Sequence, residues 1–152
     1  MDAAAAAALH PTRFRTKKGT NSRARTLLGR APRRRYYAIP LVHSPMQAPE
    51  RVFEENAEAL ARFGNANRRT FAAQTILLDA SVGALVGALR AAGLRDDTLL
   101  VVASDNGGMP AADSAGSNWP LRGMKGYYFE GGVRTHALIN SPLIPPAACG
   151  TT

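Results

Sequence analysis

The fold of this chain is decided by residues 98–108, TLLVVASDNGG, in which an apolar run stops abruptly at an acid, an amide and two glycines. The β-branched and leucine-rich part, Thr98 to Ala103, predicts a buried β-strand. Ser104-Asp105-Asn106-Gly107-Gly108 then places polar side chains at the carboxyl end of that strand, where open α/β sheets bind their ligands. The segment therefore predicts an α/β fold with a ligand site at the end of the strand.

A long helix is predicted directly before this strand. Residues 68–92 carry apolar side chains near the helical period, and Gly93 suits the C-terminal stop. Residues 94–97 form a short turn into the strand, which gives a helix-to-strand connection of the α/β type. Further upstream, residues 50–63 have helical composition with an acidic beginning, and residues 64–67 break that helix.

Two further strands are predicted, one on either side of these elements. Residues 36–42 predict a short strand, in which Pro40 indicates an edge position or an irregular end. This strand delivers His43 into a loop, so that polar chemistry again follows a strand. After the central strand, residues 109–126 predict irregular structure and residues 133–139 predict another strand.

The positive charge of the chain is concentrated at its beginning. The formal net charge is +8, yet residues 1–35 hold ten basic residues and one acid, and residues 36–152 hold nine basic and ten acidic residues. Residues 1–35 are rich in Ala and Arg, and we expect a disordered leader. The alternatives are a basic arm for RNA or a membrane surface, a transit-type targeting segment, and a mispredicted upstream coding segment. Beyond this leader the sequence makes no strong case for a nucleic-acid partner.

Targeting and redox signals are weak. Asp2 and the short alanine run make a poor secretory signal, and no uninterrupted run reaches the roughly 18 apolar residues that a membrane span needs. Cys149 is the single cysteine, so an intrachain disulfide is excluded.

An ordered series of motifs between about Tyr36 and Ile144 resembles the sulfatase family, and most closely its arylsulfatase B-like branch. The series comprises Val42-His43-x-Pro45, a helix carrying Asp79 and Gly83, Gly93-Leu94-x-Asp96-x-Thr98, Ser104-Asp105-Asn106-Gly107-Gly108, Asn118-Trp119-Pro120-Leu121-Arg122-Gly123-x-Lys125 and Glu130-Gly131-Gly132-Val133-Arg134. Each motif is weak alone, whereas the ordered series is specific. The resemblance implies an alkaline-phosphatase-like mixed sheet flanked by helices, with residues 36–146 as a partial catalytic domain and residues 147–152 as a tail.

The resemblance implies metal-dependent hydrolysis of sulfate esters and assigns roles to four residues. Asp105 and Asn106 are the expected metal ligands, for Ca²⁺ first and Mg²⁺ second, because both offer hard oxygens. Lys125 resembles the lysine that contacts the substrate sulfate, and His43 the histidine that also reaches the sulfate and can donate or handle a proton. Each role has a structural alternative. The Asp-Asn-Gly segment could close a hairpin turn, Lys125 could be a solvated surface lysine, and His43 could be a structural histidine whose ring is hydrogen-bonded within the fold.

Several neighbouring residues have expected structural roles. Arg122, Glu130 and Arg134 stand beside glycines and are expected to hold the loop through paired hydrogen bonds. Trp119 is expected either to form the floor of an aryl or sugar pocket or to pack within the fold. Asp79, inside the long helix, is expected to be structural.

The chain lacks other parts of the family pattern. The family nucleophile is a formylglycine made within a Cys-x-Pro-Ser-Arg motif, and Cys149 has neither the required Pro nor the Arg around it. The early pair of metal-binding aspartates is also missing, because Asp96-Asp97 precedes a strand instead of following one. We therefore expect a middle portion of a longer sulfatase that is inactive alone and, with open sheet edges, poorly soluble.

The remaining expectations concern the parent protein. Its substrate would be a sulfate-ester small molecule or glycan, and the family implies a lysosomal, secretory or extracellular location. The alternatives are a related phosphoesterase of the alkaline-phosphatase superfamily, a non-catalytic truncated sulfatase paralogue, and a nucleic-acid-binding protein acting through residues 12–35.

Overall fold

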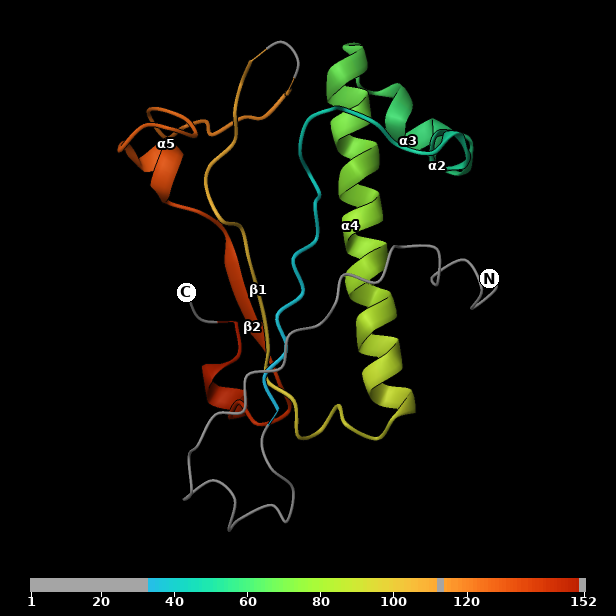
Figure 1. Ribbon diagram of the computed structural model, residues 1–152, viewed down its shortest axis with the longest axis vertical. Helices are drawn as coiled ribbons and strands as arrows, with labels where there is room; N and C mark the ends of the chain where they lie inside the picture. The colour runs from blue at the N-terminus through green and yellow to red at the C-terminus, as the bar shows by residue number, and fades with distance from the viewer. Residues whose placement is uncertain (1–32, 112–113, 151–152) are drawn as a thin grey trace. The chain divides into compact units, whose positions relative to one another are not determined.

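The computed structural model describes residues 33–111 and 114–150, which fall into two units divided after Pro40. The first unit is described over residues 33–40, which contain no helix and no strand. The second unit, from Leu41 onward, contains all the labelled elements in Figure 1. The predicted basic leader lies outside the described residues except for its last three.

The predicted helix over residues 50–63 is two short helices, α2 (Glu50–Glu55) and α3 (Ala57–Ala61). Asn56 separates them, because its side-chain Nδ2 donates a 2.9 Å hydrogen bond back to the carbonyl of Val52. Asparagine side chains compete with the backbone in this way and interrupt helices. The prediction of one continuous helix is therefore wrong at Asn56.

The long predicted helix is α4 (Ala66–Ala91), and it is confirmed. It begins before Arg68 because Asn65 caps it, accepting a 2.9 Å hydrogen bond from the Arg68 amide. Its end is also as predicted, since Gly93 adopts a φ of +62° just beyond the last turn. Helices α2 and α3 both pack against α4 (Figure 1), and Val52, Leu60 and Ala73 form the buried core between them.

By length and composition α4 is also able to cross a membrane, contrary to the prediction that no segment qualifies. The prediction counted uninterrupted apolar runs, whereas α4 qualifies by the mean hydropathy of a window in which polar residues such as Thr75, Asp79 and Ser81 interrupt the apolar ones. A packing helix of a soluble protein passes the same test, so this single helix is weak support for a membrane span.

The described sheet has two strands, β1 (Leu100–Ala103) and β2 (Ala137–Asn140). They pair antiparallel, with Leu100 opposite Asn140 and Ala103 opposite Ala137. The central predicted strand is thus confirmed. The last predicted strand begins only at Ala137, because the preceding residues form the short helix α5 (Glu130–Val133).

Residues 36–42 form no strand, and this prediction is wrong. A strand exists only through ladder hydrogen bonds, and Pro40 has no N–H to donate. The prediction that β1 is buried is also wrong, because its residues alternate between half-buried and exposed while all of β2 is exposed. The described residues thus form a small antiparallel sheet with helices, and they leave large apolar side chains of the sheet accessible, including Val101, Leu138 and Ile139.

Candidate functional site

The structure brings His43 and Lys125 into direct contact although they are 82 residues apart. Lys125 Nζ lies 2.9 Å from His43 Nε2. The other ring nitrogen, Nδ1, lies 2.8 Å from the carbonyl oxygen of Ser44. A carbonyl only accepts, so Nδ1 carries the proton in this bond, and the Nε2 of the neutral ring accepts from the lysine ammonium. The two residues predicted to contact sulfate therefore form one polar pair that solvent reaches.

Two side chains hold the loop that carries His43. Gln74 of α4 is 2% exposed, and its Nε2 donates to the carbonyl oxygens of His43 at 3.2 Å and Gln47 at 3.1 Å. The Ser44 hydroxyl lies 3.1 Å from that of Ser114, which belongs to the long loop after β1. The position of His43 thus depends on side-chain contacts and not on the strand that was predicted before it.

The prediction missed Gln74. Its only signal in the sequence is a polar residue three positions from both Phe71 and Leu77, on a side of the helix where apolar residues recur.

Asp105 and Asn106 lie just after β1, separated from it by Ser104, as predicted. Asn106 Nδ2 donates a 2.6 Å hydrogen bond to Asp105 Oδ1, and the Ser104 hydroxyl donates to the Asn106 carbonyl at 2.8 Å. The alternative of a hairpin turn is wrong, because the antiparallel partner of β1 begins only at Ala137, after a long excursion. The Asp-Asn pair therefore stands at the end of a strand with its side chains accessible.

Gly107 and Gly108 connect this pair to the two later motifs. The Gly107 amide donates to the carbonyl of Gly132 at 2.9 Å, and the Lys125 amide donates to the carbonyl of Gly108 at 3.2 Å. A Cβ atom added at Gly107 would overlap the carbonyl oxygen of Gly131. The close approach of these backbones requires glycine, and it places the segment of Lys125 beside the end of β1.

Asn118 is a second residue to which the prediction assigned no role. Its Oδ1 accepts from the Gly108 amide at 2.7 Å, and its Nδ2 donates to the carbonyls of Gly108 at 2.8 Å and Gly123 at 3.1 Å. It lies within the quoted Asn118-to-Lys125 motif, so its place in the motif was the available signal. One side chain therefore ties the strand end to the loop that leads to Lys125.

The arginines and the glutamate of these motifs interact with near neighbours. The Arg122 guanidinium carbon lies 4.0 Å from the centroid of the Phe129 ring, and Arg134 pairs with Glu130 at 3.5 Å. The latter pair is highly exposed, so its contribution to stability is small. Neither contact is the paired hydrogen bonding that was predicted to hold the loop, so the structural roles of these three residues stay predictions.

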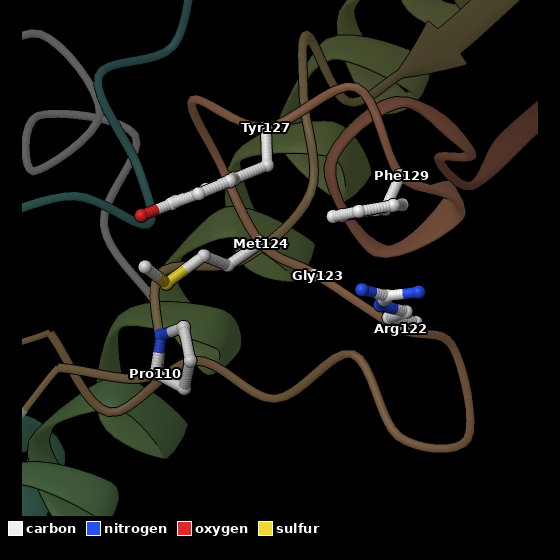
Figure 2. A pocket seen from close by; sticks show the side chains of 6 residues that line it. All are labelled: Pro110, Arg122, Gly123, Met124, Tyr127 and Phe129. Carbon is white, nitrogen blue, oxygen red and sulfur yellow. The ribbon is translucent and has the colours of Figure 1, made fainter.

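A shallow pocket of about 330 Å³ lies beside Arg122 and Phe129, and Figure 2 shows the side chains around it. It is lined by Pro110, Arg122, Gly123, Met124, Tyr127 and Phe129. Trp119 is not among these residues and is 89% exposed. Neither role predicted for Trp119, pocket floor or packed side chain, is seen.

Asp105 and Asn106 are the right types of ligand for a hard divalent cation, but they are too few to complete its coordination. Asp105 and Asn106 supply carboxylate and amide oxygens, the ligands that Ca²⁺ prefers, but Ca²⁺ takes about six to eight oxygens. Within the described residues no group of three or more acidic, histidine or cysteine side chains is placed to hold a metal. A complete cation site would therefore need ligands in addition to these two.

Comparison with known proteins identifies the family of this chain. The family model described as Sulfatase matches residues 8–150. The chain is 44% identical over 109 residues to arylsulfatase J of Mus musculus, covering 72% of this chain and 17% of that protein. It is 35% identical over 114 residues to N-acetylgalactosamine-6-sulfatase of Sus scrofa, covering 74% and 20%.

A solved structure gives the same result. The crystal structure of Ps i-CgsB in complex with k-i-k-neocarrahexaose matches with a TM-score of 0.59 at 34% identity, covering 68% of this chain and 22% of that one. The chain thus spans about a fifth of the length of these relatives. They indicate an alkaline-phosphatase-like α/β fold, of which the described residues form a small sheet with helices. On the family match and the shared sequence, the chain belongs to the sulfatase family.

Proposed function

We propose that this chain carries the sulfate-contacting and cation-binding side of a sulfatase centre, as part of the hydrolysis of sulfate esters. The observation that carries the proposal is the 2.9 Å contact between Lys125 Nζ and His43 Nε2. Two segments far apart in the sequence converge on one basic pair, and among the described residues no carboxylate forms an ion pair with either member. A basic pair without a carboxylate partner suits an oxyanion.

In this proposal Lys125 and His43 bind and orient the sulfate group. The ammonium of Lys125 provides fixed positive charge where negative charge builds up during ester cleavage. His43 presents Nε2 to the same place, because Nδ1 is engaged with the Ser44 carbonyl. The imidazole can therefore hold or pass one proton at Nε2.

Asp105 and Asn106 would hold a divalent cation, with Ca²⁺ preferred over Mg²⁺, together with ligands outside this pair. When bound, such a cation supplies Lewis-acid stabilisation of the sulfate oxygens. Asn118 and Gly108 keep the end of β1 connected to the Lys125 segment, so the cation ligands and the sulfate contacts would be held in one framework.

The chain does not contain the Cys-x-Pro-Ser-Arg motif from which sulfatases form their formylglycine nucleophile. Cys149 is exposed, and its thiol lies 3.7 Å from the Pro145 carbonyl, a contact that does not activate a thiolate. We therefore propose that the 152-residue chain alone has no turnover. Family membership supports a lysosomal, secreted or extracellular parent that acts on a sulfate-ester small molecule or glycan.

The proposal is tested by titrating inorganic sulfate into the purified chain and into the Lys125→Gln variant, with NMR as the readout. We expect Lys125→Gln to weaken sulfate binding about tenfold or more, since a charge-assisted hydrogen bond is lost. Arg62→Gln is the matched control, because it removes one exposed positive charge from the end of α3. Equal losses in the two variants would mean non-specific attraction and would contradict the proposal.

A second measurement addresses activity. An aryl sulfate is incubated with the purified chain, and product release is followed over time. Hydrolysis that disappears in Lys125→Ala would show that the chain is itself an enzyme, contrary to the expected lack of turnover.

A further inference from the structure

Gln74 stands out as a polar side chain buried where an apolar one would pack. It is 2% exposed and follows Ala73, which is fully buried in the core formed by α2, α3 and α4. Its Oε1 is buried and, across the part of the chain that the structure describes, has no hydrogen-bond partner. An acceptor that loses water without gaining a donor is costly, so this glutamine is not explained by the stability of the helix packing.

The other half of the same amide is fully used. Nε2 donates to the carbonyl of His43 at 3.2 Å and to that of Gln47 at 3.1 Å. These carbonyls mark the two ends of residues 43–47, which belong to no helix or strand. Backbone groups of such a segment must find partners outside a ladder, and one buried amide serves both ends.

We infer that Gln74 is a positioning residue for the candidate sulfate site, holding the backbone of His43 so that the imidazole reaches Lys125. The inference rests on the proposed function for the identity of the ligand. Gln74 touches the main chain of His43 and not its ring, so its effect passes through His43. Once that backbone is held, the bond from Nδ1 to the Ser44 carbonyl sets the ring orientation, and Nε2 meets Lys125 Nζ.

The test compares Gln74→Met with Leu60→Ala in the full chain. Methionine has a similar length, so it keeps the packing of this side chain while it removes both the Nε2 donor and the unpaired Oε1. A change at His43 in this variant would therefore come from the lost hydrogen bonds and not from lost packing. Leu60 is 3% exposed and belongs to the same core, and its apolar side chain has no polar group with which to hold the loop. The readouts are the ring resonances of His43 in NMR spectra, the affinity for inorganic sulfate, and urea unfolding.

We expect Gln74→Met to shift the His43 ring resonances and to weaken sulfate binding about tenfold. Leu60→Ala is expected to lower stability and to leave both of the other readouts unchanged under conditions where it is folded. If Gln74→Met changes only the unfolding transition, Gln74 is structural and the inference is overturned. If sulfate binds to neither chain but the His43 resonances still move in Gln74→Met, the positioning role stands and the sulfate proposal fails.

Gln74→Glu provides a second variant in case the methionine variant does not fold. A carboxyl group buried at this position remains protonated and can donate to one of the two carbonyls. Its His43 resonances and sulfate affinity are therefore expected to lie between those of the wild type and of a chain without the donor. A folded Gln74→Glu with His43 resonances and sulfate affinity like those of the wild type would show that one of the two hydrogen bonds is enough to hold the loop, and it would support the positioning role.

Discussion

Asn118 engages both backbone polar groups of Gly108: its Oδ1 accepts from the Gly108 amide at 2.7 Å and its Nδ2 donates to the Gly108 carbonyl at 2.8 Å. The same carbonyl accepts from the Lys125 amide at 3.2 Å. A side-chain amide that pairs with the N–H and C=O of one residue makes the two hydrogen bonds that a neighbouring β-strand would otherwise make. The arrangement joins the end of β1 to the segment of Lys125 without any regular secondary structure between them.

Asn118→Ala is expected to lower the free energy of unfolding by about 1–3 kcal/mol, because the half-buried Gly108 amide and Gly123 carbonyl lose their hydrogen bonds to the Asn118 side chain. It should also weaken sulfate binding, since the Lys125 segment loses one of its anchors. Urea unfolding and sulfate titration measure the two effects. Asn118→Asp is the matched comparison, because it retains the acceptor for the Gly108 amide and loses both donated bonds. A sulfate affinity equal to that of the wild type in both variants would contradict this account of Asn118.

Binding of sulfate is expected to take up a proton. In the free protein Nε2 of neutral His43 accepts from Lys125, whereas a sulfate oxygen only accepts, so Nε2 must gain a proton before it can donate to the ion. Calorimetric titrations in two buffers of different ionisation enthalpy measure the proton number directly. Identical heats in the two buffers would rule out proton uptake.

Binding of Ca²⁺ to this chain alone is expected to be weak, with a Kd of about 1 mM or more, because Asp105 and Asn106 offer few of the oxygens that the ion needs. Asp105→Asn should abolish what binding remains. Asp96→Asn, which removes an exposed carboxylate from the turn before β1, is the control. Tight calcium binding that survives Asp105→Asn in a calorimetric titration would show that the ion binds elsewhere.

Gly107→Ala is expected to destabilise the fold by about 1–3 kcal/mol, because its Cβ would overlap the carbonyl oxygen of Gly131. Gly83 in α4 provides the opposite case, since no atom lies within 4 Å of its Cβ position. Gly83→Ala should stabilise the helix by about 1 kcal/mol through helix propensity. Unfolding curves of the two variants that shift in the same direction would contradict the close approach at Gly107.

The exposed face of the sheet is expected to limit solubility. Leu138 in β2 is 55% exposed, and a two-stranded sheet with apolar faces and open edges is prone to association. Leu138→Lys should raise the yield of soluble monomer, measured by size-exclusion chromatography, with little change in the free energy of unfolding. The control is Val52→Lys in the buried core, which should unfold the chain. A soluble yield of Leu138→Lys no higher than that of the wild type would argue against aggregation through this face.

Local features were the ones that could be predicted from the sequence. The course of α4, its stop at Gly93 and the strand that ends at Ala103 depend on periodicity and on residues within one turn, and the structure has them all. The errors lie where a distant or competing contact intervenes. Asn56 divides a predicted helix through its own side chain, and the residues after Phe129 form α5 before β2 begins.

The amino-acid sequence by itself determined the sulfatase family, which the family match over residues 8–150 confirms, because the motifs that indicated it are short and local. It also determined that Asp105 and Asn106 follow a strand. Only the tertiary structure decided that His43 lies against Lys125 and that Gln74 holds the loop of His43. Contacts between residues so far apart in the chain arise only when separate elements pack together, and no local pattern specifies which side chains then meet.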